Sequence, residues 1–231
     1  MGYTKYNYDR NYFERIDNEE KAYWLGFIAA DGNVASKMNV MRINLNEIDR
    51  EHLEKFRDSI KGNQPIKDSI REKNHSVYID MSSQKVCEDL YKYGVTPKKS
   101  LTLDINYDLI PEELIHHFIR GYFDGDGSLN LYTRPPYFYD EWELSFISTE
   151  KVLLSFQDFI GIQHKLYTCG NNYRFCYKAK KDIEKALIYM YEDASIFLDR
   201  KFEKVQEFLS PSETTKEHPV LDDGIVQTTT E

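Results

Sequence analysis

Long apolar segments are absent from this sequence. The longest mainly apolar run, residues 22–30, is far shorter than the roughly 20 residues that a membrane-spanning helix requires, and the N-terminal residues are polar rather than signal-like. Hydrophobic residues still make up 41% of the 231 residues and aromatic residues 14%, which is enough for one large domain or two small ones. We therefore expect a soluble, cytoplasmic protein with no membrane partner.

Cysteine is scarce, and the spacings typical of several enzyme classes are missing. Cys87, Cys169 and Cys176 are odd in number and form no close CxxC pair, so the sequence indicates neither a disulfide framework nor structural zinc. The six histidines show no HNH-like or HExxH spacing, and there is no Walker glycine loop. No small-molecule cofactor is expected.

Positive charge is also in deficit. The formal net charge is −9, the wrong sign for a protein that neutralises DNA phosphates. Residues 210–231 hold five acidic residues and one lysine and are rich in Pro, Ser and Thr, so we expect a disordered acidic tail there. The remaining residues keep a formal charge of −5, and DNA binding would require their basic side chains to gather on one face.

What the sequence does contain is an internal repeat. Residues 24–32, WLGFIAADG, are matched by residues 119–127, IRGYFDGDG, which lie 95 positions later. Each copy is followed by two alternating segments, a helical segment, two further alternating segments and another helical segment. Each half is therefore predicted to be an α-β-β-α-β-β-α unit, and the chain an α+β fold of two tandem, pseudo-symmetric repeats.

The periodicity of the apolar residues places the other elements. Helices are predicted at residues 49–60, 84–93, 150–160, 181–193 and 198–209, and strands near residues 41–46, 64–71, 76–81, 129–131, 142–146, 163–168 and 173–178. These elements divide the chain into a first repeat with an N-terminal arm (1–94), a linker (95–110), a second repeat (111–209) and the tail (210–231).

The ends of the two motif helices carry recognisable signals. Asp17 and Glu20 resemble a capping box that starts the first helix, and Gly32 is expected to end it in a left-handed conformation. Pro111 and Gly127 are expected to start and end the second helix in the same way.

Small residues form a stripe on each motif helix. Gly26 and Ala30 lie four residues apart on the first helix, and Gly121 and Gly125 lie four apart on the second. Glycine inside a helix costs about 0.5–1 kcal/mol relative to alanine, so the stripes predict that the two helices pack against each other at close range.

Parallel packing of these helices would bring Asp31 and Asp126 together at their ends. Two carboxylates at two helix C-termini suit a hard divalent cation such as Mg²⁺, which can stabilise charge on a scissile phosphate and acidify a bound water. A single Asp-Gly at a helix end is usually only a cap or turn, but here the stripe and the element order occur twice. A calcium loop beginning at Asp124 is rejected because Leu129 stands where that loop needs glycine.

The two nonapeptides resemble the motif that gives the LAGLIDADG homing endonuclease family its name. The similarity covers about residues 12–209; the second copy is acidic at Asp124 and Asp126, whereas the first has Ala29 in place of the family's earlier aspartate. The resemblance implies a saddle-shaped monomer with internal pseudo-two-fold symmetry, in which a four-stranded sheet from each half lies in the major groove of double-stranded DNA. It also implies that Asp31 and Asp126 hold Mg²⁺, which Mn²⁺ or Ca²⁺ can replace for binding.

Polar residues on the predicted strands are candidates for DNA contacts, because Arg and Asn can pair bidentately with guanine and adenine edges. The alternative explanation is that half-exposed strands always carry polar residues on their open face. The candidates are Arg42, Asn44, Asn46, Asn130, Tyr132, Arg134, Arg174 and Lys178.

The resemblance further implies a lysine near the scissile phosphate in each half. The segments PKKS (97–100) and DRKF (199–202) lie at equivalent places in the two repeats. We expect Lys99 and Lys201 to be catalytic, stabilising the pentavalent phosphate or the water network around the metal, and Lys98 and Arg200 to hold phosphate beside them. The alternative is that these lysines are only solvated charges.

The sequence thus predicts a magnesium-dependent, site-specific DNA endonuclease that makes a staggered double-strand break. An RNA maturase or a non-cleaving DNA-binding regulator on the same scaffold is the alternative, and the intact acid at the eighth position of both motifs favours the enzyme. A third alternative is an endonuclease block from an intein. Met1 and Gly2 stand where a splice-junction nucleophile would be expected, which favours a protein encoded within an intron or between genes.

Overall fold

The computed structural model describes residues 6–35, 38–71, 74–134 and 139–210. Within these residues, two series of elements repeat the same order. The first consists of α1 (Glu19–Asp31), β1 (Gly32–Ala35), β2 (Val40–Asn46), α2 (Arg50–Ser59), β3 (Lys67–Arg71), β4 (Asn74–Ser82) and α3 (Gln84–Lys92). The second consists of α4 (Ile115–Asp126), β5 (Ser128–Arg134), β6 (Tyr139–Ser148), α5 (Glu150–Ile160), β7 (Tyr167–Cys169), β8 (Asn172–Tyr177) and α6 (Lys180–Tyr191), and α7 (Asp199–Leu209) follows it. The predicted α+β fold of two α-β-β-α-β-β-α units is confirmed.

Each half contains one four-stranded antiparallel sheet, and the strand orders β1-β2-β4-β3 and β5-β6-β8-β7 correspond. The alternation in β2 explains how the sheet is oriented, because Met41, Ile43 and Leu45 are buried while the residues between them are exposed. The period-two pattern therefore turns one face of the sheet to the core and leaves the other open. No helix in the described parts of the chain is long and apolar enough to span a membrane.

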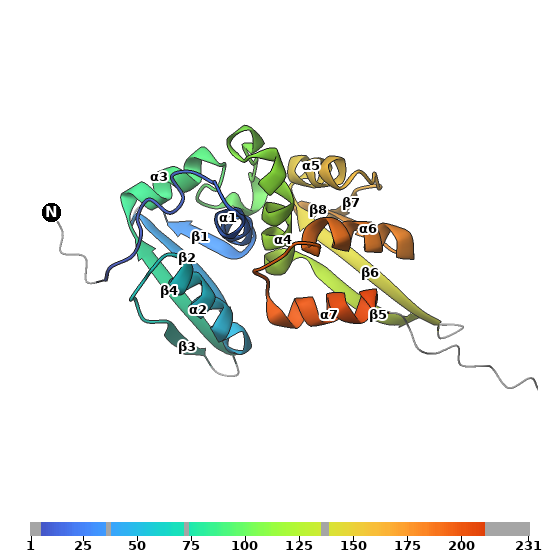
Figure 1. Ribbon diagram of the computed structural model, residues 1–231, viewed down its shortest axis with the longest axis horizontal. Coiled ribbons are helices and arrows are strands. Elements are labelled where there is room, and N and C mark those ends of the chain that lie inside the picture. Colours follow the sequence, from blue (N-terminus) through green and yellow to red (C-terminus); the bar gives the residue numbers. More distant parts are fainter. Residues whose placement is uncertain (1–5, 36–37, 72–73, 135–138, 211–231) are drawn as a thin grey trace, which may run out of the picture.

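The two halves meet along α1 and α4, which lie between the two sheets (Figure 1). A Cβ atom added to Gly26 would lie 1.9 Å from the carbonyl oxygen of Phe118, and one added to Gly121 would lie 1.9 Å from that of Tyr23. The two contacts are equivalent, since Phe118 lies 95 residues after Tyr23 and Gly121 lies 95 residues after Gly26. Farther along, a Cβ on Gly125 would meet the Cβ of Ala30 at 2.4 Å, so the helices run parallel with their backbones nearly in contact.

Close packing explains why α1 has little amphipathic pattern. All residues from 22 to 30 are buried, because the other motif helix covers one side and the sheet and helices of its own half cover the rest. Trp24, for example, packs edge to face against Phe56 of α2 with ring centroids 4.9 Å apart. A helix that is apolar all round is typical of this central position.

The start of α1 differs by one residue from the prediction. Its N-cap is Asn18 rather than Asp17, and the Asn18 side chain accepts a hydrogen bond from the backbone N–H of Lys21. At α4, Pro111 precedes a short 3-10 turn, Glu112–Leu114, and the α-helix itself begins only at Ile115.

The predicted left-handed caps at Gly32 and Gly127 are wrong. Both glycines have extended backbone, with φ of −70° and −74°, because the chain turns directly from each motif helix into a strand. Glycine is required there for space instead. An added Cβ on Gly32 would lie 2.6 Å from the carbonyl oxygen of Ile28.

Candidate functional site

Asp31 and Asp126 are the last residues of the paired helices α1 and α4. Both reach solvent, yet the surrounding protein is dense enough to perturb them. Burial and repulsion from the Asp126 carboxylate raise the pKa of Asp31 to about 6, against the opposing charges of Lys201, Lys99 and Arg200. Burial also raises the pKa of Asp126, opposed by Lys99 and Lys201. The two carboxylates therefore share one electrostatic environment.

This arrangement fits a divalent cation. Two carboxylates lie where two helix C-termini each contribute partial negative charge, and oxygen donors of this kind are the ligands that Mg²⁺ takes in proteins. Burial disfavours the charged form of both carboxylates, and Asp126 adds repulsion at Asp31; a bound divalent cation would offset this cost.

Lys99 reaches this site from a short 3-10 helix, Lys99–Leu101. Lys98 immediately before it has a left-handed backbone with φ of 59°, and the sharp turn leaves Lys98 exposed while Lys99 is buried. The Lys99 ammonium donates a hydrogen bond to the carbonyl oxygen of Ala30, in the last turn of α1. Burial lowers the pKa of Lys99, while Asp126 and Asp31 act to raise it.

Lys201 reaches the site from the first turn of α7 and is likewise buried. Its ammonium donates hydrogen bonds to the carbonyl oxygens of Phe123 and Gly127, both at 2.6 Å. Burial lowers the pKa of Lys201 to about 8. The structure thus brings together the two predicted aspartates and the two predicted lysines, with one lysine against the end of each motif helix.

A buried network around Asp124 was not predicted from the sequence. The Asp124 carboxylate accepts hydrogen bonds from the hydroxyls of Tyr23 (2.8 Å) and Tyr191 (2.6 Å) and from the backbone N–H of Leu198 (2.7 Å). His52 Nε2 lies 3.0 Å from the same Tyr23 hydroxyl. Because that hydroxyl donates to Asp124, the His52 ring donates in turn, and the network joins α1, α2 and α4 to the start of α7.

The segment before α7, residues 194–198, is also tied to the first half of the chain. Glu19 accepts hydrogen bonds from the backbone N–H and the hydroxyl of Ser195, each at 2.7 Å. Lys55 pairs with Asp199 at 2.7 Å. These contacts fix the position from which Lys201 enters the site, and they join residues too far apart in the sequence to form a motif.

One sequence signal could have indicated these contacts. Arg120 is a basic residue inside the second motif, and it is fully buried. Its guanidinium donates to Glu19 at 2.6 Å, to the carbonyl oxygen of Ile196 and to His117 Nδ1. A buried arginine requires several acceptors, so its presence in the motif predicts a polar partner from another element.

The predicted DNA-contact residues of the first sheet lie on its open face. Arg42, Asn44 and Asn46 are all exposed. Arg42 is already engaged, however, since it pairs with Asp80 at 2.6 Å and stacks over the Tyr78 ring at 4.1 Å. The Asn46 side chain caps the following 3-10 turn, accepting from the backbone N–H of Ile48.

The second sheet shows the same pattern. Arg174 pairs with Glu143, and Lys178 lies 3.2 Å from Glu141. Asn130 accepts a hydrogen bond from Lys204 of α7 at 2.8 Å. Tyr132 is exposed on β5, whereas the side chain of Arg134 lies outside the described residues.

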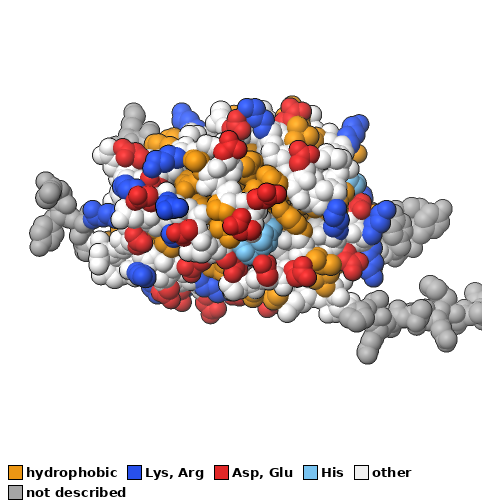
Figure 2. All heavy atoms as spheres, turned by 45° about the horizontal axis from the view of Figure 1, so that its top comes forward, with side chains coloured by type: hydrophobic (Ala, Val, Ile, Leu, Met, Phe, Trp, Pro, Cys, Tyr) orange, Lys and Arg blue, Asp and Glu red, His pale blue; other side chains and the backbone are white. Residues whose placement is uncertain are grey.

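Arg200, predicted to hold phosphate, pairs with Asp49 at 2.8 Å. Most of the described basic candidates are therefore engaged with acidic groups of the same chain. Figure 2 shows acidic and basic side chains intermingled on the face that it displays, rather than one wholly basic patch.

A second cluster that could hold a metal lies away from these aspartates. Ring nitrogens of His116 and His117 and a carboxylate oxygen of Asp193 all lie within 4.8 Å of one another. Arg120, however, donates a hydrogen bond to His117 Nδ1 at 2.7 Å. Arginine stays protonated, so the proton of the neutral His117 ring is on Nε2, and that nitrogen has no lone pair for a metal.

No family model matches the chain. Two curated proteins of Methanocaldococcus jannaschii are similar in part of their sequence. An uncharacterized protein is 26% identical over 170 residues, which cover 68% of this chain and 60% of that protein. The replication factor C small subunit is 27% identical over 117 residues, which cover 50% of this chain and only 6% of that protein.

Several solved structures share the architecture. The meganuclease I-CpaMI bound to uncleaved DNA superposes with a TM-score of 0.54 at 18% identity, covering 83% of this chain and 90% of that one. I-GzeII in complex with its DNA target gives 0.54 at 16% identity, with 83% and 88% covered. I-SmaMI bound to cleaved DNA gives 0.52 at 15% identity, with the same coverage of 83% and 88%. This chain therefore has the LAGLIDADG homing endonuclease fold, as the two nonapeptides predicted.

Proposed function

We propose that this protein is a site-specific DNA endonuclease of the homing type, which makes a staggered break in double-stranded DNA by metal-dependent phosphodiester hydrolysis. One observation carries the proposal: Asp31 and Asp126 converge at the end of a glycine-packed helix pair, with the buried Lys99 and Lys201 against the two helix ends. The fold supports it, because solved structures of the same fold hold DNA. A monomer suffices, since one chain contributes both halves of the site.

In this proposal Asp31 and Asp126 hold Mg²⁺, and Mn²⁺ or Ca²⁺ can replace it for binding. When bound, the cation supplies charge stabilisation at the scissile phosphate and lowers the pKa of a water. Lys99 and Lys201 keep positive charge beside the carboxylates and are positioned by backbone carbonyl groups. Such fixed charges can stabilise the negative charge that develops on the phosphate oxygens.

The open faces of the two sheets are the proposed surface for the DNA major groove. Asn44 is exposed there, and Arg42, Arg174 and Lys178 lie on the same faces. Because Asp80, Glu143 and Glu141 already accept from these basic groups, DNA has to compete for them. That competition applies equally to the second candidate, a non-cleaving DNA- or RNA-binding protein on the same scaffold, which differs from the first only in not cutting at the Asp31 and Asp126 site.

The two candidates are separated by a cleavage assay. Duplexes are selected from a randomised pool by incubation with the protein and Mg²⁺, and the recovered duplex is then tested with Asp31→Asn and Asp126→Asn. Each substitution removes one carboxylate charge, so double-strand cleavage should be lost while binding is largely kept. Asp108→Asn, at an exposed acid outside the site, is the matched control. Cleavage by both aspartate variants would contradict the assignment, and binding without any cutting by the unmodified protein would favour the second candidate.

A further inference from the structure

One of the differences between the two halves of the proposed site lies at positions 29 and 124, which are equivalent. Position 124 in the second motif is aspartate, and the equivalent position 29 in the first is alanine. Asp124 accepts the backbone N–H of Leu198 at 2.7 Å, three residues before Lys201. Ala29 is buried and has no side-chain acceptor to offer the segment that carries Lys99.

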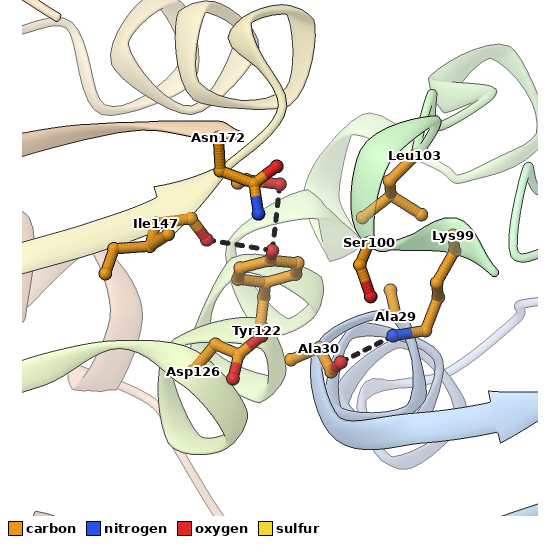
Figure 3. A pocket seen from close by; sticks show the side chains of 10 residues that line it. Ala29, Ala30, Lys99, Ser100, Leu103, Tyr122, Asp126, Ile147 and Asn172 are labelled. Carbon is orange, nitrogen blue, oxygen red and sulfur yellow. Dashed lines mark hydrogen bonds between the residues drawn. The ribbon is translucent and has the colours of Figure 1, made fainter. Parts of the chain in front are cut away.

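A cavity of about 270 Å³ lies on the alanine side. Figure 3 shows it between the Lys99 segment, the ends of α1 and α4, and the second sheet. Ala29, Lys99, Asp126 and Asn172 are among the residues that line it. The Asn172 side-chain oxygen is buried and has no hydrogen-bond partner among the described residues. This side therefore has space and an unused acceptor, whereas on the other side the Asp124 carboxylate accepts three hydrogen bonds.

The two lysines are held to different degrees. Within the described part of the chain, the Lys99 ammonium donates to one carbonyl oxygen, that of Ala30, whereas Lys201 donates to those of Phe123 and Gly127 and lies 3.5 Å from that of Gly125. The segment before Lys201 is also fixed by the contacts of Glu19, Lys55 and Asp49 described above.

The Lys99 segment has fewer anchors. Thr149 donates to the carbonyl oxygen of Leu103 at 2.7 Å, and Lys151 forms an exposed ion pair with Asp104. Lys98 adopts a left-handed backbone, with φ of 59°, which is unfavourable for a residue other than glycine. The Lys99 half of the site is therefore the less preorganised one.

We infer, on the basis of the proposed function, that the two half-sites cut at unequal rates and that the half-site built on Lys201 acts first, so that a nicked duplex accumulates. Each nick is the same hydrolysis. The water oxygen forms a bond to phosphorus as the bond from phosphorus to the leaving oxygen breaks; the water gives up a proton to solvent, and the leaving oxygen takes one up. Catalytic groups that are fixed before the reaction lower its barrier more than groups that must first be ordered.

The test follows each strand separately. A duplex recovered from a randomised pool by selection for cleavage carries a different fluorescent label on each strand, and both cleavage rates are measured with Mg²⁺. We expect one strand to be cut about tenfold faster, which corresponds to a barrier difference of about 1.4 kcal/mol. Lys201→Met should slow the fast strand selectively, and Lys99→Met the slow one.

Two further variants test the cause of the difference. Ala29→Asp supplies the missing acceptor and should narrow the ratio of the two rates, whereas Ala29→Val, which adds bulk without an acceptor, should not. Asp124→Ala is the reciprocal change and should slow the fast strand alone. In the DNA-free protein, amide hydrogens of residues 96–101 should exchange faster than those of residues 196–201, a difference that requires no substrate.

The outcomes separate this inference from the function on which it rests. Equal rates on the two strands, a fast strand that depends on Lys99, or equal exchange in the two lysine segments would overturn the inference and leave the endonuclease proposal intact. Failure to recover any cut duplex from the pool would overturn the endonuclease proposal and the inference with it.

Discussion

Replacing Gly121 with alanine should force the two motif helices apart. An added Cβ would lie 1.9 Å from the carbonyl oxygen of Tyr23, 2.8 Å from the carbonyl carbon of that residue and 2.9 Å from the backbone nitrogen of Phe27. All three obstacles are backbone atoms of α1, so no side-chain rotation can relieve them. Since carbon atoms rest at about 3.5–4.0 Å, the helices would have to separate by more than about 1 Å.

The cost follows from two opposing contributions. Inserting a methyl group into a well-packed interior destabilises a protein by about 1–3 kcal/mol, and sometimes by more. Alanine in place of glycine inside a helix regains about 1 kcal/mol. Because the obstacle at Gly121 is rigid, we expect the upper end of the first range, and a net loss of about 2 kcal/mol or more in the free energy of unfolding.

The pair formed by Ala30 and Gly125 provides a matched control. Gly125→Ala alone would place two methyl groups 2.4 Å apart and should also destabilise. Adding Ala30→Gly removes the obstructing methyl, after which the next atoms are at 3.5 Å, an ordinary contact. The double variant exchanges the two small residues between the helices, so helix propensity cancels and stability should return to within about 1 kcal/mol of the original.

Urea denaturation followed by circular dichroism gives the free energies of unfolding of the unmodified protein, Gly121→Ala, Gly125→Ala and the double variant. The helix-packing explanation would be refuted if Gly121→Ala were as stable as the unmodified protein, or if Gly125→Ala were not rescued by Ala30→Gly. Either result would mean that α1 and α4 do not pack at this distance. The two aspartates would then lose the structural reason for their proximity.

Three further predictions concern pH, metal and salt. Burial lowers the pKa of His52 to about 3, so the stability that the neutral ring contributes is full above pH 6.5 and is lost as pH falls toward 3, by up to about 5 kcal/mol. His52→Gln should therefore reduce the fall of the urea midpoint between pH 6.5 and 3, and an unchanged fall would contradict this. The raised pKa of Asp31, about 6, means that the metal-free protein loses stability as pH rises from about 4 through 6, so the increase in Tm caused by Mg²⁺ should grow over this range and be much smaller in Asp31→Asn. Asp80 pairs with Arg42 and Lys67 at 2.6 and 3.4 Å, so Asp80→Asn should strengthen DNA binding. The slope of the logarithm of the binding constant against the logarithm of the salt concentration should steepen by roughly 0.9 for each new phosphate contact, and an identical slope would argue against DNA binding on this face.

Much of the fold could be predicted because its determinants are local or repeated. The alternation of buried and exposed residues in β2 is a direct consequence of strand geometry. The helix pair could be predicted because glycine inside a helix is costly and occurred at matching positions in two copies. Gly26 and Gly121 indeed lie against backbone atoms of the opposite helix.

The parts of the site that could not be predicted depend on contacts between distant residues. Lys55 pairs with Asp199 across 144 positions, and Asp124 accepts from Leu198 across 74. Neither pair has a spacing that a sequence pattern could reveal. The choice between Lys98 and Lys99 likewise depends on a single left-handed residue that turns one side chain outward and the other inward.

The position of the acidic groups decides how the negative net charge affects DNA binding, because they lie beside the basic side chains of the open faces rather than on a separate face. On the first sheet Arg42 of β2 pairs with Asp80 of β4, and on the second sheet Arg174 of β8 pairs with Glu143 of β6. Each acid holds a donor in place on the open face while cancelling its charge. A side chain that is already ordered loses less conformational entropy on binding, and a neutralised face attracts phosphates weakly. Under the proposed function, this protein should bind unrelated DNA weakly at physiological salt and depend on base-edge contacts for its affinity.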